Sequence, residues 1–279
     1  MSTAAKAAEA KRVQDAFLDR LADRVASHAS NRGPPRKLSI RYVLGRIWHV
    51  CTSGCSWRDL EVPGGSPKTV FHHFNRWSRM RLFDDEFHDL AKLYFLSSET
   101  PCNLVADTSF VKNVYGQDVL GSNPVDRGRR ATKVSVLADT LGAPLFACYH
   151  AANKNDCTTL RHLLDQSSRT LGPLEPCRML LADKGYDTLT CRAACIRHGL
   201  NPIIDHKRKR RVAGAPRHPP QPSDPRGRRR IMVEHVFGRL DQKRRLRVRY
   251  EAKIVNFRSF HSLGFTADLA RRLVRSGHI

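Results

Sequence analysis

The spacing of apolar residues changes near residue 100, and this change restricts what the chain can fold into. Before it, apolar side chains recur every three or four positions, as on one face of a helix, in the ranges 6–29, 38–52 and 84–97. After it, short β-rich runs alternate with helical stretches. That order is typical of a mixed sheet with helices packed on it. We expect an all-helical domain over residues 1–100 and an α/β domain over residues 101–279.

The α/β part contains the signals of a hairpin and of strands separated by helices. Strands are expected at 103–111, 133–139, 145–149, 179–183 and 202–204. Helices are expected at 155–166 and 188–198, with one or two more within 254–274. The turn through Thr140–Pro144 joins the second strand to the third. The helix over 188–198 is expected to stop at Gly199.

One more helix is expected over Arg228–Tyr250, a stretch dense in arginine and lysine. Four apolar residues fall at i, i+3, i+4 and i+7 and predict one buried face: Val233, Val236, Phe237 and Leu240. Glu234 is the single glutamate of this segment. A lone acid among so many cations is ordinarily a surface salt-bridge partner, so this segment alone does not make Glu234 a site residue.

The helical part contains a capped basic helix. Ser66 is placed to cap it and Pro67 to occupy its first position. A helix, a tight turn and a second capped helix with a basic face are the pattern of a helix-turn-helix, although a purely structural bundle has a similar appearance. The polar residues of this helix with the spacing to enter a major groove are Lys68, Asn75, Arg76 and Arg79.

The charge of the chain points to a polyanion as its partner. Lys and Arg number 49 against 26 Asp and Glu, a formal charge of +23. Residues 205–249 hold sixteen basic and four acidic residues, so about half of the excess lies there. Such a concentrated field favours nucleic acid, and no apolar run or signal-peptide pattern supports a membrane. We expect a soluble intracellular protein, in the cytoplasm or nucleoid of a bacterium or in the nucleus of another host.

Residues 205–227 are expected to form a mobile, basic, proline-rich loop rather than part of a core. The KRKRR run of Lys207–Arg211 suits sequence-independent phosphate contacts. It is also compatible with a nuclear-import or solubility tag.

The eight cysteines form no CxxC pair. Cys191, Cys195 and His198 would share a helical face, but a zinc site needs a fourth ligand that the sequence does not supply. We expect reduced, mostly buried thiols.

Two aspartates, Asp107 and Asp183, each close an apolar strand run. A carboxylate at a strand end is often only a turn or helix cap. If two neighbouring strand ends and Glu234 met, however, three carboxylates would repel one another, and divalent cations would relieve the repulsion. Oxygen ligands favour Mg²⁺ or Mn²⁺. Two such ions about 3.5–4 Å apart activate a water or a 3′-hydroxyl against a phosphodiester.

Several motifs together resemble the DDE transposases of bacterial insertion sequences, specifically the insertion-sequence-five group, over about residues 38–274. The helical part contributes GCSWRDL (Gly54–Leu60) and TVFHHFNRW (Thr69–Trp77). The α/β part contributes VADTSFVK (Val105–Lys112), GRRATKVSVLADTLGAPL (Gly128–Leu145), NKND (Asn153–Asp156), LLADKGYD (Leu180–Asp187) and RRRIMVEHVFGRLDQKRRLRVRY (Arg228–Tyr250).

The resemblance implies a ribonuclease H-like fold, catalytic Asp107, Asp183 and Glu234, and two Mg²⁺ ions. It also implies double-stranded DNA as the partner, at the ends of a mobile element and at its target, with a homodimer or larger assembly on DNA. The late basic segment adds Arg230, Lys243, Arg244 and Arg245 as candidate DNA contacts.

Two positions depart from the family pattern. Gly227 stands where a tyrosine is usual, and Asp241 stands where a lysine is usual, with Lys243 as a possible substitute. The first hypothesis is therefore a transposase that cleaves and joins DNA with Mg²⁺. The second is a transposase-derived DNA-binding protein that no longer transposes.

Overall fold

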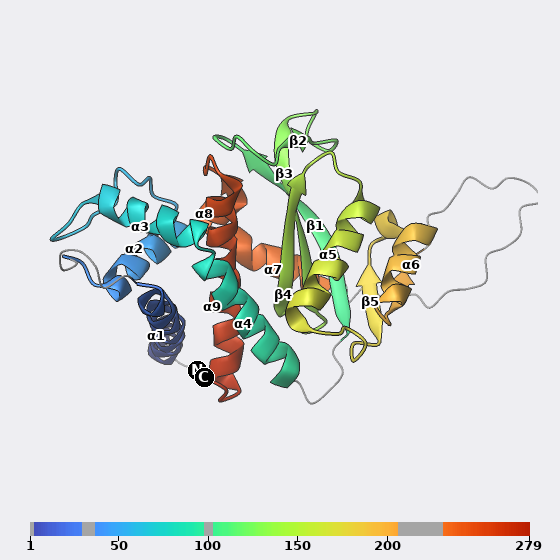
Figure 1. Ribbon diagram of the computed structural model, residues 1–279, viewed down its shortest axis with the longest axis horizontal. Coiled ribbons are helices and arrows are strands. Elements are labelled where there is room, and N and C mark those ends of the chain that lie inside the picture. Colours follow the sequence, from blue (N-terminus) through green and yellow to red (C-terminus); the bar gives the residue numbers. More distant parts are fainter. Residues whose placement is uncertain (1–2, 30–36, 98–102, 206–230) are drawn as a thin grey trace, which may run out of the picture. The chain divides into compact units, whose positions relative to one another are not determined.

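The computed structural model describes residues 3–29, 37–97, 103–205 and 231–279 (Figure 1). The chain forms two compact units, each built from separate stretches of sequence. The helical unit contains Met1–Tyr94, Lys112–Val119 and Arg239–Ile279. The sheet unit contains Phe95–Val111 and Leu120–Gly238. The predicted domain boundary at residue 100 stays a prediction.

The helical unit begins with helices whose ends agree closely with the sequence signals. Its elements are α1 (Thr3–Ser27), α2 (Ile40–Ser53), α3 (Pro67–Arg79), most of α4 (Leu82–Ser97), α8 (Arg244–Arg247), β7 (Val248–Arg249) and α9 (Ile254–Arg275). Ser66 caps α3 by accepting a hydrogen bond from the Lys68 amide, and Pro67 is the first helical residue, as predicted. Gly54 ends α2 at φ 72°, in the left-handed conformation that glycine adopts most readily.

The last helix, α9, supplies much of the core of the helical unit. It packs against α1 and α3, and Phe257, Phe260 and Leu263 are fully buried. The Phe260 ring stacks on Phe74 of α3, with ring centroids 4.4 Å apart. On α4, Asp84 receives an ion pair of 2.7 Å from Arg258 of α9. The helices from the beginning of the chain are therefore held together by a helix from its end.

The sheet unit is organised around a mixed sheet. Its elements are β1 (Leu104–Asn113, up to Val111), β2 (Gly121–Ser122), β3 (Arg130–Asp139), β4 (Pro144–Ala151), α5 (Asp156–Leu171), β5 (Met179–Ala182), the 3₁₀ helix η1 (Lys184–Tyr186), α6 (Leu189–Arg197), β6 (Asn201–Ile204) and α7 (Ile231–Asp241, up to Gly238). Strands β2, β3, β1, β5 and β6 follow one another across the sheet, and β4 pairs with β3. The hairpin of β3 and β4 is antiparallel, whereas β1, β5 and β6 are parallel. The predicted α/β class with a mixed sheet and flanking helices is confirmed.

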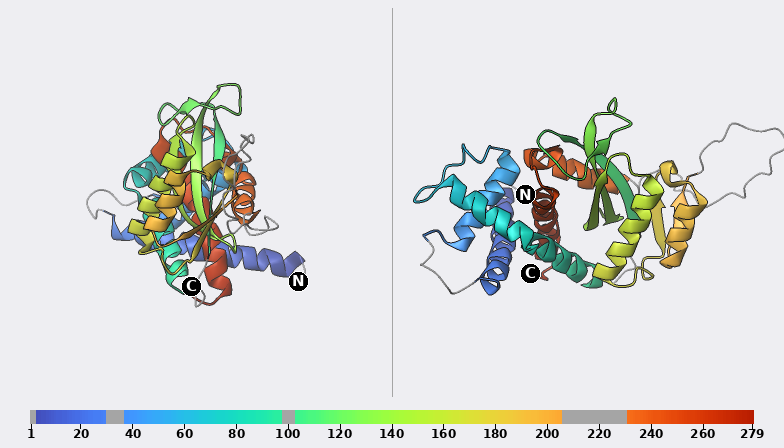
Figure 2. Two further views of the ribbon diagram at one scale, coloured as in Figure 1. Left: turned by 90° about the vertical axis from the view of Figure 1, so that its right-hand side faces the viewer. Right: turned by 45° about the horizontal axis from the view of Figure 1, so that its top comes forward.

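Helices α5 and α6 lie beside each other against the strands (Figure 2). Asn155 caps α5 and Thr188 caps α6, each accepting a hydrogen bond from a backbone amide of the first turn. The apolar residues of α5 include Leu160, Leu163 and Leu164, all buried. They fix this helix on the hairpin, which it contacts along β3 and β4.

The single helix predicted over Arg228–Tyr250 is wrong in its extent. Helix α7 ends at Asp241, and the short α8 and β7 follow. The apolar pattern holds as far as Leu240, and the chain then turns so that Arg245 and Arg249 are buried in polar contacts. Strand β2 has no counterpart in the predicted elements, and the predicted loop over residues 205–227 lies almost entirely outside the described residues. Among the described helices, none has the length and apolarity needed to cross a membrane.

Candidate active site and nucleic-acid interface

Asp107 and Asp183 lie next to each other on neighbouring parallel strands. The register of β1 with β5 pairs Ala106 with Ala182, so each aspartate is the residue that follows the last pair. Neighbouring strands are about 4.8 Å apart. Strand β5 ends at this level, whereas β1 continues, so Asp107 lies within its strand and does not close it as the sequence suggested. Both aspartates are half-buried, and the backbone thus brings two of the three predicted acids together.

A buried tyrosine, Tyr186, reports the electrostatic environment of these aspartates. Burial raises the pKa of its hydroxyl well above the usual range, while a hydrogen bond with Thr108 acts in the opposite direction. The carboxylates of Asp107, Asp156 and Asp183 raise that pKa further. Negative charges raise the pKa of a hydroxyl when they lie near it. The region is therefore a site of concentrated negative charge.

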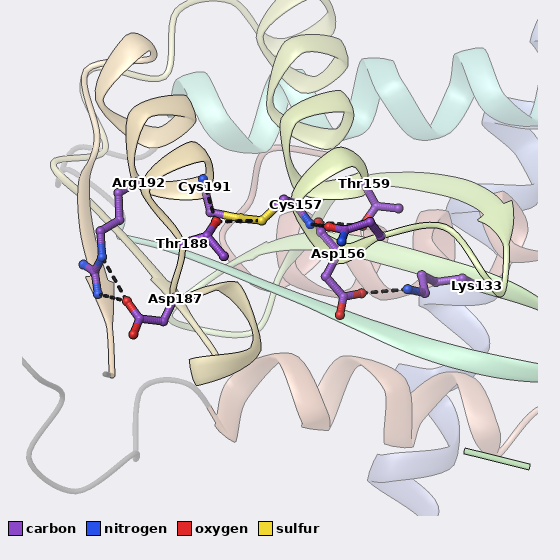
Figure 3. Close-up of a disulfide and its surroundings, with 9 residues drawn as sticks. Lys133, Asp156, Cys157, Thr159, Asp187, Thr188, Cys191 and Arg192 are labelled. Carbon is purple, nitrogen blue, oxygen red and sulfur yellow. Dashed lines mark hydrogen bonds and ion pairs between the residues drawn. A yellow bond between two sulfur atoms is a disulfide. The ribbon is translucent and has the colours of Figure 1, made fainter. Parts of the chain in front are cut away.

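Asp156 is a member of this group that the search for strand-end acids did not select. It is the first residue of α5, and Lys133 of β3 donates to it in an ion pair of 2.7 Å (Figure 3). The Lys133 ammonium also donates to the Lys154 carbonyl, at 2.7 Å, and the residue is only 3% exposed. The signal in the sequence was an asparagine cap followed by an acid, which is typical of a helix N-terminus and carries no functional information by itself.

Helix α6 is joined to its neighbours by a disulfide and by an ion pair. Cys157 of α5 and Cys191 of α6 form the disulfide, with Cα atoms 5.3 Å apart, within the usual range (Figure 3). Asp187 pairs with Arg192 at 2.9 Å, and this arginine also donates to the Ile204 carbonyl. The prediction of reduced thiols is wrong for this cysteine pair. Their 34-residue separation gave no sign of the contact, because only the packing of α5 against α6 brings them together.

Glu234 is placed differently from the two aspartates. It lies in the first turn of α7, as predicted, and its side chain is exposed. A metal ion needs at least three acids, cysteines or histidines that each bring one ligand atom close to the others. Within the described chain, such a group with these atoms within 4.8 Å of one another occurs at Cys148, His150 and His162. Asp107, Asp183 and Glu234 do not form one. The convergence of all three acids is thus not present here, and the catalytic role of Glu234 stays a prediction.

The candidate DNA contacts on α3 divide into exposed and packed residues. Lys68, Arg76 and Arg79 are exposed. Asn75 is half-buried, and its side-chain carbonyl accepts a hydrogen bond from Asn256 of α9 at 2.5 Å. The three cations are thus available to a partner of the helical unit, whereas Asn75 is engaged in packing.

The late basic residues divide in the same way. Arg244 is exposed beside Gly54, at the end of α2. Lys243 is half-buried and donates to the Arg239 carbonyl at 3.2 Å, and burial lowers the pKa of its ammonium. Arg245 is buried in an ion pair of 2.7 Å with Glu251. Arg230 lies outside the described residues.

Two family models match this chain. The model described as transposase DDE domain matches residues 100–267. The model described as putative transposase of IS4/5 family matches residues 13–87. The first match includes Asp107, Asp183 and Glu234, and the second includes α2 and α3.

Among characterised sequences, the chain is similar to a putative transposase for insertion sequence element IS402 from Burkholderia cepacia. The two are 33% identical over 154 residues, which cover 54% of this chain and 68% of that protein. Among solved structures, it is similar to a Mos1 transposase paired-end complex with left transposon end, at 10% identity and a TM-score of 0.26, covering 86% of this chain and 79% of that one. It is also similar to a Mos1 mariner paired-end complex with Mn, at 10% identity and a TM-score of 0.27, covering 90% of this chain and 82% of that one. TM-scores this low carry no argument about the fold.

Proposed function

The chain belongs to the transposases with a DDE domain, and on this premise we propose that it cuts DNA at the ends of a mobile element and joins the 3′-hydroxyl to target DNA. Asp107, Asp183 and Glu234 are the proposed catalytic and metal-binding acids. The observation that carries the proposal is the register of β1 with β5, which holds Asp107 beside Asp183.

Enzymes of this family depend on divalent metal ions, and the donor set here suits hard cations. We propose two Mg²⁺ ions, replaceable by Mn²⁺, because carboxylate oxygens are the ligands these ions prefer. The carboxylates of Asp107, Asp156 and Asp183 near Tyr186 support this assignment, since neighbouring negative charges favour a bound cation. When bound, such ions activate a water or 3′-hydroxyl and stabilise the leaving oxygen of the phosphodiester.

The protein's own residues prepare this site in two ways. Paired strands hold Asp107 and Asp183, so their positions require little reorganisation. The Lys133 ion pair fixes Asp156 at the start of α5, close enough to add to the charge at Tyr186. The exposed Glu234 is proposed to join the aspartates when metal and DNA are bound.

The sheet order β4-β3-β1-β5-β6, with the last three strands parallel, supports the narrower proposal of a ribonuclease H-like fold. Since two element ends are handled together, the active form is proposed to be at least a dimer on DNA. The exposed Lys68, Arg76 and Arg79 of α3 are the proposed positioning contacts to double-stranded DNA.

The test is the cleavage of labelled element ends by purified protein with Mg²⁺. Replacing Asp183→Asn is expected to abolish cleavage while DNA binding is kept or improved, because the change removes a negative charge beside the phosphates. Glu234→Gln is expected to behave in the same way. Asp126→Asn is the matched control: Asp126 lies in the turn before β3, loosely paired with Arg129 at 4.0 Å, and its loss should leave cleavage intact. Cleavage by the Asp183 variant at the parent rate would refute the assignment.

A second candidate is a transposase-derived DNA-binding protein that no longer transposes. It is favoured by Asp241, which is exposed where the family has a lysine, and by the half-buried Lys243, whose ammonium is engaged with a carbonyl. Protein that shifts the element ends but never nicks them with Mg²⁺ or Mn²⁺ would establish this candidate instead. Terminal inverted repeats with a short target duplication around the coding sequence would favour the first.

A further inference from the structure

Cys148, His150 and His162 form a cluster that the proposed chemistry does not use. Cys148 and His150 are two residues apart on β4, so both point to the same face of the strand. His162 comes from α5, which packs against β4. One ligand atom of each residue lies within 4.8 Å of the others, and the two imidazole rings meet edge to face with centroids 5.2 Å apart.

The Nε2 atom of His150 is buried and has no hydrogen-bond partner among the residues that the structure describes. Buried polar atoms are nearly always hydrogen-bonded, so such an atom calls for an explanation. The lone pair of an imidazole nitrogen is the ligand that a metal ion requires.

We propose that Cys148, His150 and His162 bind one thiophilic divalent ion of the zinc class, with water in the fourth position. A thiolate and two imidazoles are a donor set that suits zinc and differs from the oxygen set proposed for Mg²⁺. Tetrahedral bonds of about 2.0–2.3 Å place the ligand atoms roughly 3.5 Å from one another. The ligand atoms lie within 4.8 Å of one another here, so metal binding requires them to move closer together, and His150 is partly exposed and His162 exposed.

Two lysines near the cluster oppose a cation there, but both are compensated. Lys133 is the cross-strand partner of His150, and its ammonium is neutralised by Asp156. Lys154 is exposed, so solvent screens its charge. The Cys148 thiolate formed on binding adds a negative charge at the site itself.

The ion would fasten α5 to β4, and this has a measurable consequence. An ion that binds the folded chain and not the unfolded one raises stability by mass action. The inference does not depend on transposition, because Asp107, Asp183 and Glu234 take no part in it.

The experiment uses the full-length chain, stripped with a chelator and titrated with Co²⁺ in excess Mg²⁺, which occupies oxygen sites. The parent is expected to take up one Co²⁺ per chain with the near-ultraviolet thiolate charge-transfer band and visible bands of a four-coordinate ion. Zn²⁺ should displace it and raise the thermal midpoint. His162→Ala should weaken uptake at least tenfold, and His162 is exposed, so this variant tests the site without disturbing the core.

Cys148→Ser should remove the charge-transfer band. The matched controls are Cys55→Ser, a half-buried cysteine of the helical unit, and His198→Ala, a histidine paired with Asp165. Both should bind Co²⁺ as the parent does. Unchanged uptake in His162→Ala, or no thiolate band in the parent, would overturn the proposal.

Discussion

Gly54 ends α2 in a left-handed conformation and close to Arg244, and both features favour glycine at this position. Its φ is 72°, and an added Cβ would lie 2.5 Å from Cβ of Arg244 on α8. The left-handed backbone costs a non-glycine residue about 1–2 kcal/mol, and overpacking typically adds about 1–3 kcal/mol. We expect Gly54→Ala to lower the free energy of unfolding by about 2–5 kcal/mol, measured by denaturant titration.

The control for this change lies ten residues away. Gly64 also has a positive φ, 76°, but an added Cβ would meet no atom of the described part of the chain within 4 Å. Gly64→Ala should therefore cost only about 1–2 kcal/mol. Equal losses in the two variants would show that backbone strain, and not contact with α8, accounts for the effect at Gly54.

His261 makes the helical unit sensitive to acid. Burial lowers the pKa of this fully enclosed histidine from 6.5 to about 4. In the unfolded chain the ring takes up a proton below pH 6.5, whereas the folded ring stays neutral until about pH 4. The stability contributed by the neutral ring is therefore present above pH 6.5 and lost as the pH falls towards 4, by about 3 kcal/mol at most.

His261→Leu is expected to flatten this loss, seen as a smaller difference between urea midpoints at pH 7 and pH 4.5. His278→Leu, at an exposed position near the C-terminus, is the control and should leave the difference unchanged. If the His261 variant loses as much stability between pH 7 and pH 4.5 as the parent, other groups cause the acid sensitivity.

At the scale of elements, the disulfide between α5 and α6 should hold the two helices together. Its residues are 34 apart, and a cross-link closing a loop of that length typically contributes about 2–4 kcal/mol. Reductant is expected to lower the unfolding free energy of the parent by this amount. In the Cys157→Ser, Cys191→Ser double variant, reductant should have no effect. The same response in both proteins would place the redox-sensitive bond elsewhere.

Elements marked by local signals could be predicted from the sequence. Ser66 with Pro67 marks the start of α3, and the alternation in 133–139 marks β3. The aspartates at 107 and 183 were also found locally, since each follows an apolar strand run. The extent of α7, the pairing of Cys157 with Cys191 and the place of Asp156 beside Tyr186 could not be found in this way. Each depends on contacts between residues far apart in the chain, which no short pattern encodes.

At the scale of the whole molecule, a formal charge of +23 should make DNA binding strongly dependent on salt. Lys68, Arg76 and Arg79 are exposed on α3, and each phosphate contact contributes about 0.9 to the slope of log K against log salt. Replacing all three by Gln should reduce the slope by up to about three and erode preference for the element's own ends, measured by binding titrations at several salt concentrations. Arg197→Gln, an exposed change on α6, is the control.

The KRKRR run, Lys207–Arg211, lies outside the described residues, and its role stays a prediction from charge alone. Neutralising it should weaken binding to all DNA alike and flatten the salt dependence, without changing end preference. If the variant keeps the parent's slope of log K against log salt, the run does not contact phosphates and acts instead as an import or solubility signal.

Because α9 completes the core of the helical unit, the order of synthesis matters. A ribosome making about 5–20 residues per second releases α1 to α4 roughly 10–40 seconds before α9 is finished. Until then, the apolar faces that α9 covers, including the Phe74 ring that stacks on Phe260, have no partner from this helix. A prematurely terminated chain would have the helices that carry the proposed DNA contacts but not the helix that packs them. A finished helical unit thus exists only on a chain whose sheet segment has already been translated.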